Sequence, residues 1–287
     1  MPSQPRKPVK QIFKERLKRL RRQCVRTCYH FTAGDLQTAL RKVGIRTGDV
    51  ILVHSSFERF EAFEGTAAKV IQVLQASVGP SGTILMPTIP FTGTSVEYAT
   101  GAPVFDVQRT PSQMGIISEL FRRMPGVHRS VHPTHSVAAW GENAEQLISD
   151  HFMAETPCGR CTPYGRLLAF AGKLLFLGTS IEAMTFFHTV EEELEKTMPF
   201  SPFTRDTFVL ASKEANGTLR TTTTRLFDPV YSRRRRISKL VPTLTTSGHW
   251  KRIRVGNLEI TLLNAVDVLQ ATEILCKQGI YCYDLEV

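Results

Sequence analysis

Short apolar runs alternate with amphipathic segments along most of this chain. The apolar runs are "DVILVHSS" at 49–56, "GTILMPT" at 82–88, "SVAAWG" at 136–141 and "GKLLFLGT" at 172–179. Such runs are typical of strands that are covered on both faces of a sheet. The segments between them carry apolar residues at helical spacing, at 65–79, 112–124, 143–152 and 183–196. This alternation predicts an α/β fold with a mixed, largely buried central sheet covered by helices on both faces.

The pattern changes after about residue 198. Segments 206–212 and 218–228 flank "EANG" and are typical of an exposed β-hairpin, and a strand and a closing helix follow at 257–279. We therefore expect a basic N-terminal helix at 1–26 and one α/β domain at 27–287, in which about 198–260 forms a smaller, more β-rich region.

Two local signals refine this picture. Thr32 and Asp35 predict a capping box that starts a helix, and Gly44 is expected to end it. Residues 88–111 are rich in Gly, Pro and Thr and lack periodicity, which favours a functional loop over a core element.

Most of the net charge of +10 comes from the N-terminus. Residues 1–26 hold ten Lys or Arg and one Glu, whereas the rest of the chain holds 26 basic and 25 acidic residues. Phe13, Leu17, Leu20 and Cys24 form one apolar stripe of a helix in this segment. Either the stripe docks on the body, or residues 6–26 contact an anionic membrane or nucleic acid. The nearly neutral body is compatible with a homo-oligomer.

The sequence argues against several protein classes. No apolar stretch reaches the roughly 18 residues of a membrane span, and the N-terminus lacks the apolar core of a secretory signal, so we expect a cytoplasmic protein. The six cysteines include "CGRC" at 158–161, but no second Cys or His pair completes a zinc site. The patterns GxGxxG, GxxxxGK[ST] and GxSxG do not occur.

Two groups of polar residues are candidates for catalysis. The stretch "HRSVHPTHS" at 128–136 holds three histidines and is a metal site, a nucleophile with its base, or a polar loop. In "TFFHTVEEE" at 185–193, His188 and Glu191 stand three positions apart and share one helix face. This pair is either a general base held by a carboxylate or a surface ion pair.

Taken together, these motifs resemble the aminoglycoside 3-N-acetyltransferase family. The matching pieces follow one another as "VHSSF", "GTAAKVIQVLQASVGPSGTILMPT", "TPSQMGIISELFRRMPGVHRSVHPTHSVAAWG", "GKLLFLGT" and "TFFHTVEEE". The resemblance implies direct transfer of an acetyl group from acetyl-CoA to a small amine, with no metal and no covalent enzyme intermediate. It implies that His188 is the general base and that His132 lies at the site. The carboxylate that orients His188 would be Glu191, Asp228 or Asp106.

The resemblance also implies which residues line the two substrates. The residues expected on the CoA side are Ser55, Ser56, Thr110, Ser112 and Arg129. Asp106 and Glu192 are expected to bind the acceptor. The acceptor would be an aminoglycoside antibiotic or a related aminosugar. Because "SRRRR" at 232–236 would repel a polycation and attract anions, a nucleotide-linked or surface-polysaccharide aminosugar is the alternative.

Two further hypotheses belong to other classes. In one, the basic N-terminal helix binds nucleic acid or a membrane, and the transferase body is inactive. In the other, Ser55 or Ser136 acts with a histidine as a hydrolase.

Overall fold

The computed structural model describes residues 20–284 except 22, 24 and 26. Within this part, one seven-stranded sheet has the order β4-β5-β2-β1-β6-β10-β9, and a second sheet has the order β3-β7-β8. The strands of the central sheet are β1 (Val50–Ser55), β2 (Thr83–Pro87), β4 (His128–Arg129), β5 (Val137–Gly141), β6 (Lys173–Leu177), β9 (Lys251–Val255) and β10 (Leu258–Asn264). The small sheet holds β3 (Phe105–Asp106), β7 (Phe203–Lys213) and β8 (Leu219–Phe227). The sheet is mixed as predicted, since β1 pairs in parallel with β2 and β6 while β5 and β10 join antiparallel.

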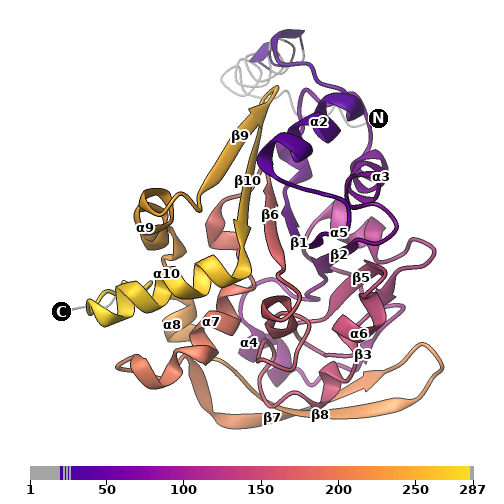
Figure 1. The fold of residues 1–287 in the computed structure, drawn as a ribbon. Helices are drawn as coiled ribbons and strands as arrows, with labels where there is room; N and C mark the ends of the chain where they lie inside the picture. Colours follow the sequence, from indigo (N-terminus) through magenta and orange to yellow (C-terminus); the bar gives the residue numbers. More distant parts are fainter. Residues whose placement is uncertain (1–19, 22, 24, 26, 285–287) are drawn as a thin grey trace, which may run out of the picture.

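Helices cover both faces of the central sheet, which confirms the predicted fold class. Figure 1 shows α2 and α3 on one side of the sheet and α7, α9 and α10 on the other. The described helices are α2 (Ala33–Val43), α3 (Ala67–Val78), α4 (Ser95–Thr100), α5 (Ile116–Phe121), α6 (Ala144–Ile148), α7 (Phe187–Glu193), α8 (Pro229–Arg234), α9 (Val241–Thr246) and α10 (Ala265–Lys277).

Alternate residues of the central strands enter two separate cores. On β1, Ile51 and Val53 pack with α2, α3 and α5, whereas Val50 and Leu52 pack with α7 and α10. Because helices cover both faces of the sheet, these strands carry apolar side chains on both faces. Their sequences therefore appear as continuous apolar runs.

The predicted capping signals of the first helix are present. The Thr32 side chain accepts from the backbone of Asp35, the Asp35 carboxylate accepts from the backbone of Thr32, and α2 ends at Gly44, whose φ is +123°. Of the predicted N-terminal helix, residues 20, 21, 23 and 25 are described and helical, and the remainder lies outside the described residues. Leu20 is 60% exposed there, while Val25 packs against the body.

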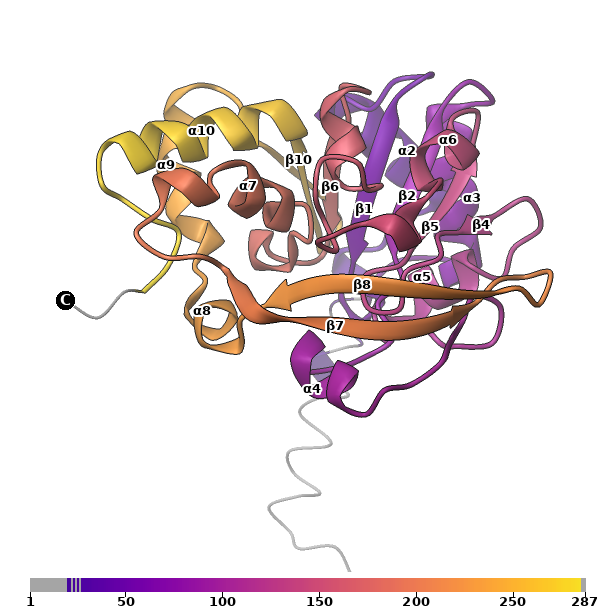
Figure 2. The ribbon, with the colours of Figure 1, turned by 90° about the horizontal axis from the view of Figure 1, so that it is seen from below.

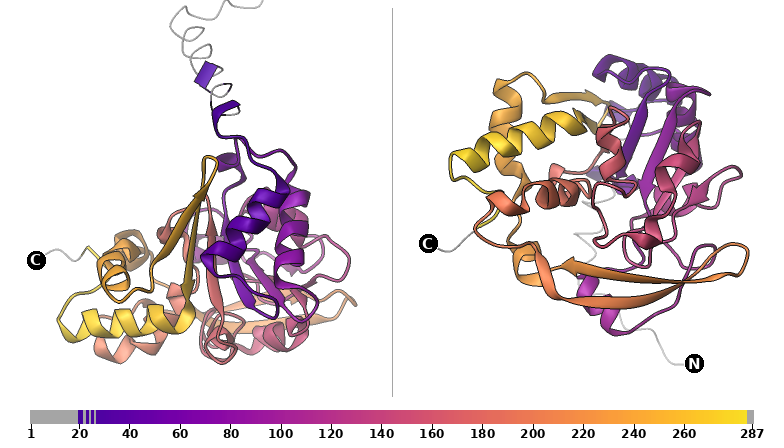
Figure 3. Two further views of the ribbon diagram at one scale, coloured as in Figure 1. Left: turned by 45° about the horizontal axis from the view of Figure 1, so that its top comes forward. Right: turned by 60° about the horizontal axis from the view of Figure 1, so that its bottom comes forward.

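The predicted hairpin is present as β7 and β8, joined by a turn at residues 214–218. It spans the width of the body at one end of the molecule (Figures 2 and 3). Residues 88–111 contain more structure than expected, because α4 packs on this hairpin and β3 pairs with β7. The start of α4 is a capping box between Thr94 and Glu97.

Candidate active site

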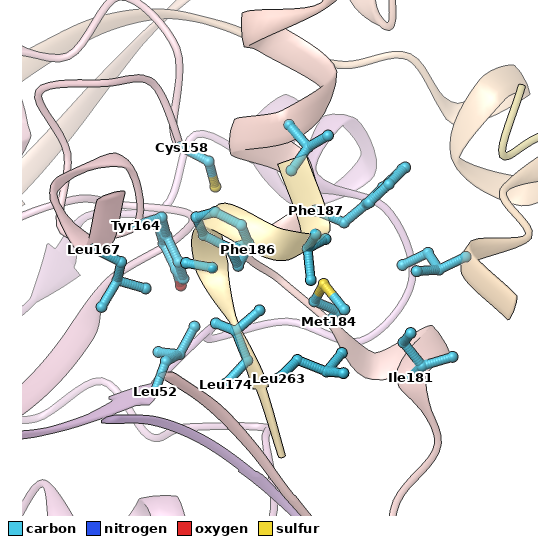
Figure 4. Packing of buried hydrophobic residues seen from close by; sticks show 14 of the residues in the cluster. Leu52, Cys158, Tyr164, Leu167, Leu174, Ile181, Met184, Phe186, Phe187 and Leu263 are labelled. Carbon is cyan, nitrogen blue, oxygen red and sulfur yellow. The ribbon is translucent and has the colours of Figure 1, made fainter. Parts of the chain in front are cut away.

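The first turn of α7 is fixed in the core beside the central sheet. Figure 4 shows Phe186 and Phe187 packed toward Leu52, Leu174 and Leu263 from the strands. On its other side, Thr189 donates a hydrogen bond of 2.6 Å to the carbonyl of Cys158. Because the residues on both sides of it are buried, His188 has a defined position at the start of the helix.

His188 and Glu191 are in contact, as their spacing predicts. His188 Nδ1 lies 2.7 Å from Glu191 Oε2. An ionised carboxylate only accepts hydrogen bonds, so Nδ1 carries the proton and Nε2 keeps its lone pair. The His188 side chain is 14% exposed, and among the described residues its hydrogen-bond contacts involve Nδ1 and not Nε2. The Nε2 lone pair is therefore the free acceptor of this ring.

Glu191 is buried and fully hydrogen-bonded. Its Oε1 accepts from Arg235 Nε at 2.6 Å and from the Tyr283 hydroxyl, and its Oε2 accepts from His188 Nδ1 and from Arg235 Nη2 at 3.2 Å. Four donors thus occupy about four lone-pair sites of the carboxylate. A buried carboxylate is tolerated when it is paired and hydrogen-bonded in this way.

Charges around this pair set its protonation. Burial alone would raise the pKa of Glu191, but Arg235 and His188 outweigh it and lower that pKa to about 2. Burial and the Arg235 guanidinium lower the pKa of His188. Together they outweigh Glu191, which raises that pKa. At neutral pH the site therefore holds an ionised Glu191, a cationic Arg235 and a neutral His188.

Aromatic rings enclose the His188 imidazole. Phe227 at the end of β8 stacks on it, and His135 approaches it edge-on with ring centroids 5.7 Å apart. Further histidines continue this contact into the interior. The His135 ring contacts the His132 ring, and His132 stacks on His151 with ring centroids 4.4 Å apart.

His132 is completely buried and holds an unpartnered donor. Its Nδ1 accepts from the backbone N–H groups of Thr134 and His135 at 3.3 and 3.1 Å. Nε2 therefore carries the proton, and it has no partner in the described structure. Burial keeps the pKa of His132 well below its usual range, so the ring is neutral.

Arg129, expected on the CoA side, lies buried beneath the 88–111 segment. It donates to Thr88 Oγ1, Thr88 O, Ser136 Oγ, Val107 O and Thr110 O at 2.6–3.2 Å, and its guanidinium lies over the Phe105 ring. Arg129 thus ties this segment to Ser136, which directly precedes β5.

The other residues expected on the CoA side lie in two places. Ser55 and Ser56 are partly exposed where β1 ends. Thr110 Oγ1 accepts from the backbone of Asp106, and Ser112 is buried beside Ser118 and Glu119 at the start of α5. No hydrogen bond or ion pair joins the two groups within the described part of the chain.

Of the three carboxylates expected to orient His188, only Glu191 contacts it. Asp228 caps α8 by accepting from the backbone of Val230 at 2.7 Å. Asp106 pairs in register with Lys213, at the far end of the hairpin from Phe227. The two strands of the hairpin are 11 and 9 residues long, so its ends lie roughly 30 Å apart at about 3.3 Å per residue. Asp106 therefore holds the turn of its own loop, where it accepts from Gln108 and Arg109.

Glu192, an expected acceptor ligand, faces the 156–162 loop. Its carboxylate accepts from Thr156, and burial raises its pKa. The neighbouring Glu193 pairs with Arg160 of the same loop.

The other candidate chemistries find little support in the geometry. Ser136 is buried and donates to the Thr88 carbonyl, so its hydroxyl is not activated by a histidine. In the "CGRC" segment Cys158 is buried and Cys161 exposed, and both are free thiols. Among the described residues no cluster of His, Cys, Asp or Glu is suited to a metal ion, and no helix is long and apolar enough to cross a membrane.

Arg235, Tyr283 and Phe227 are the site residues that sequence reasoning missed. They contact His188 or Glu191 from positions 39 to 92 residues away in the chain. Arg235 belongs to the "SRRRR" run at 232–236. We interpreted that run only as one positively charged segment, so the individual role of Arg235 was not predicted. Tyr283 had none, because only the packed fold brings the C-terminal segment to α7.

Comparisons with known proteins identify the family of this chain. The family model described as aminoglycoside 3-N-acetyltransferase matches residues 52–276. Aminoglycoside N(3)-acetyltransferase IV from Salmonella sp is 34% identical over 165 residues, which cover 57% of this chain and 59% of that protein. The YokD protein of Bacillus subtilis, an aminoglycoside N(3')-acetyltransferase-like protein, is 31% identical over 186 residues, covering 58% and 66%. The chain thus spans about three-fifths of these relatives.

The fold is similar to solved structures over nearly all of the described body. Aminoglycoside acetyltransferase AAC(3)-Xa matches with a TM-score of 0.77 at 22% identity, covering 92% of this chain and 99% of that one. AAC(3)-IVa matches with a TM-score of 0.72 at 27% identity, covering 88% and 90%.

Proposed function

The chain belongs to the aminoglycoside 3-N-acetyltransferase family, and on this premise we propose that it transfers the acetyl group of acetyl-CoA to an amine of an aminoglycoside or related aminosugar. His188 acts as the general base in a direct transfer. The transfer forms an amide bond between the acceptor nitrogen and the acetyl carbon, while the thioester C–S bond breaks and CoA leaves as the thiol. His188 Nε2 takes the proton that the acceptor amine loses and passes it to the departing CoA sulfur, which restores the neutral imidazole.

The observation that carries this proposal is the 2.7 Å contact between His188 Nδ1 and Glu191 Oε2. Glu191 fixes the proton on Nδ1, so Nε2 presents a lone pair to which no described residue donates. Because burial and Arg235 lower the pKa of His188, the ring is available as a base at neutral pH. Glu191 then stabilises the imidazolium that forms when the acceptor loses its proton.

The described residues offer suitable partners for acetyl-CoA, which would supply the acetyl group as a thioester. Ser55 and Ser56 present hydroxyls at the carboxyl end of a parallel strand, where ligands of α/β sheets collect. The buried, unpartnered Nε2–H of His132 fits a carbonyl oxygen. Thr110, Ser112 and Arg129 would shape the CoA side from the 88–111 segment and its neighbours. AAC-IIIb, a relative by fold, was solved with CoASH.

An amine-rich acceptor fits the site better than an anionic one. Of the "SRRRR" run, Arg235 is bound to Glu191, Arg236 to Asp284 and Arg233 to Glu97. These pairings weaken the argument for a carboxylated or nucleotide-linked aminosugar. Glu192, which has no ion-pair partner among the described residues, would attract a polycation instead. A variant of AAC(3)-IVa was solved in complex with gentamicin.

The test combines binding and turnover with the purified chain. Calorimetric titration with acetyl-CoA is expected to show one site per chain. A panel of aminoglycosides and aminosugars is then read by release of CoA thiol. Mass spectrometry is expected to find one added acetyl group on an acceptor amine and none on the protein. An acetylated protein would contradict direct transfer, and absence of both acetyl-CoA binding and thiol release would contradict the proposed activity.

A further inference from the structure

We infer that Arg235 and Tyr283 are positioning residues that hold Glu191, and through it His188, in the geometry needed for proton transfer. This inference rests on the proposed function, since it adds a second layer to the same catalytic pair. Neither residue is expected to touch a substrate.

The contacts on Glu191 support this assignment. Arg235 donates to both carboxylate oxygens, from Nε to Oε1 at 2.6 Å and from Nη2 to Oε2 at 3.2 Å. Such a two-point contact fixes the plane of the carboxylate. The Tyr283 hydroxyl donates to Oε1 and so leaves Oε2 directed at His188. A carboxylate held by Arg235 and Tyr283 has little freedom to turn away from the imidazole.

Tyr283 reaches Glu191 because the C-terminal segment is fastened to the residues after α8. The backbones of Arg235 and Tyr283 form an antiparallel bridge, with Arg236 N donating to Cys282 O and Asp284 N donating to Arg234 O, both at 2.8 Å. Asp284 also forms ion pairs with Arg236 and Lys239. The Tyr283 ring is 2% exposed and packs edge-on against Phe200. Arginine and tyrosine therefore reach Glu191 as one unit.

The charged and titratable groups around His188 and Glu191 show which of them balances the Glu191 charge. His188 faces Glu191 on its own helix, Arg235 from the segment after α8 and His135 from the 128–136 segment. Glu191 faces Tyr283 and Cys282 from the C-terminal segment and Cys158 from the 156–162 loop. Burial raises the pKa of the Cys158 and Cys282 thiols. Burial, and to a smaller extent the charge of Glu191, raises the pKa of Tyr283. All three groups are therefore neutral. Arg235 is therefore the cation that balances Glu191.

Removal of either donor is expected to raise the pKa of His188. Arg235→Gln removes a cation whose Nη2 lies 3.4 Å from His188 Nδ1 and which disfavours protonation of the ring. Tyr283→Phe leaves more of the Glu191 charge directed at the imidazole. Arg235→Lys keeps the charge but loses the two-point contact, so it should shift the pKa less while still lowering kcat.

The experiment compares these variants with two matched controls. Tyr281→Phe removes a hydroxyl two residues from Tyr283 in the same segment. Arg160→Gln breaks the ion pair between Arg160 of the 156–162 loop and Glu193 of α7. Histidine NMR titration follows His188, whose signal is identified by its loss in His188→Gln. Thermal denaturation and acetyl-CoA titration check that each variant is folded.

The expected result is an upward pKa shift of His188 in Tyr283→Phe and Arg235→Gln, with kcat lowered about tenfold or more by the misdirected base. Both controls should match the unaltered chain. A folded Tyr283→Phe with unchanged His188 titration and unchanged kcat would overturn the inference. If Arg235→Gln does not fold, Tyr283→Phe alone decides. If the unaltered chain transfers no acetyl group, the proposed function fails, and the NMR titration still decides whether the two residues control His188.

Discussion

The phenyl ring of Phe227 lies against the imidazole of His188, with ring centroids 3.7 Å apart and ring planes 25° apart. The contact joins the end of β8 to the first turn of α7, two elements that are separate in the sequence. Phe227 is itself held by Phe203, whose ring centroid is 5.0 Å away. One face of the imidazole is therefore covered, and the ring plane is set by the hairpin as well as by Glu191.

Replacing Phe227 by leucine should lower activity more than stability. Leucine keeps most of the apolar volume, so unfolding in urea should show a loss below about 1.5 kcal/mol. The flat contact with His188 is lost, and kcat should fall about tenfold because the base is less well oriented. Phe203→Leu is the matched control, since it alters the same cluster without touching His188. Equal kcat values for the two variants would contradict a role of the stack in catalysis.

The elements that could be predicted from the sequence are those whose signal is local. β1, β2, β5 and β6 are apolar because both of their faces are covered, and α2 carries its own capping box. The His188–Glu191 contact follows from helix geometry alone. The helix α4 was missed although Thr94 and Glu97 form a readable capping box, because its six residues are too few to show periodicity.

The parts that could not be predicted depend on tertiary packing. Asp106 and Asp228 were sequence candidates beside Glu191 for the carboxylate that orients His188, and only the fold shows that they hold a turn and a helix start instead. The sequence predicts that Arg129 is a cation that binds a ligand. In the structure its guanidinium donates to backbone carbonyls instead. Tyr283 depends on a bridge between two chain segments that no pattern announces.

Buried neutral histidines should make the fold sensitive to mild acid. Burial lowers the pKa values of His54 and His151 to about 3, against about 6.5 in an unfolded chain. Below pH 6.5 the unfolded chain binds protons that the folded chain does not, so stability falls from pH 6.5 down to about 3. The two residues together should cost about 4 kcal/mol between pH 7.5 and 5, measured by urea unfolding.

Variants at two histidines test this acid sensitivity. His54→Leu should reduce the loss of unfolding free energy between pH 7.5 and 5 by about 2 kcal/mol. The exposed His128, replaced by asparagine, should leave the dependence unchanged. A pH dependence that His54→Leu does not reduce would mean that other groups cause the loss of stability.

Arg129 should matter for the 88–111 segment as a whole. Arg129→Ala removes the donor from several buried carbonyls and hydroxyls, and we expect a loss of at least about 2 kcal/mol in unfolding free energy. Limited proteolysis should then cut within 88–111. Arg109→Ala, at an exposed position of the same segment, serves as the control. If Arg129→Ala weakens acetyl-CoA binding without changing stability or proteolysis, the residue binds CoA directly.

Glu191 should contribute to both stability and pH dependence. Glu191→Gln leaves the buried Arg235 without its counter-charge, and unfolding free energy should fall by about 3–5 kcal/mol near neutral pH. In the unaltered chain the Glu191 pKa is lowered to about 2 from an ordinary 4.5, so its contribution is present above pH 4.5 and is lost as the pH falls toward 2. Urea unfolding at pH 7 of the two proteins measures the difference. A loss below 1 kcal/mol would show that Glu191 is not the paired anion described here.

The most direct test of His188 as the general base is the turnover of His188→Gln with saturating acetyl-CoA and an acceptor from the panel. Glutamine keeps a polar side chain of similar size but cannot accept the proton at neutral pH. We predict that kcat falls by about 10²–10⁴-fold while calorimetry shows acetyl-CoA binding within about twofold of the unaltered chain. A kcat within tenfold of the unaltered value would contradict the account, because the proton would then leave by another route.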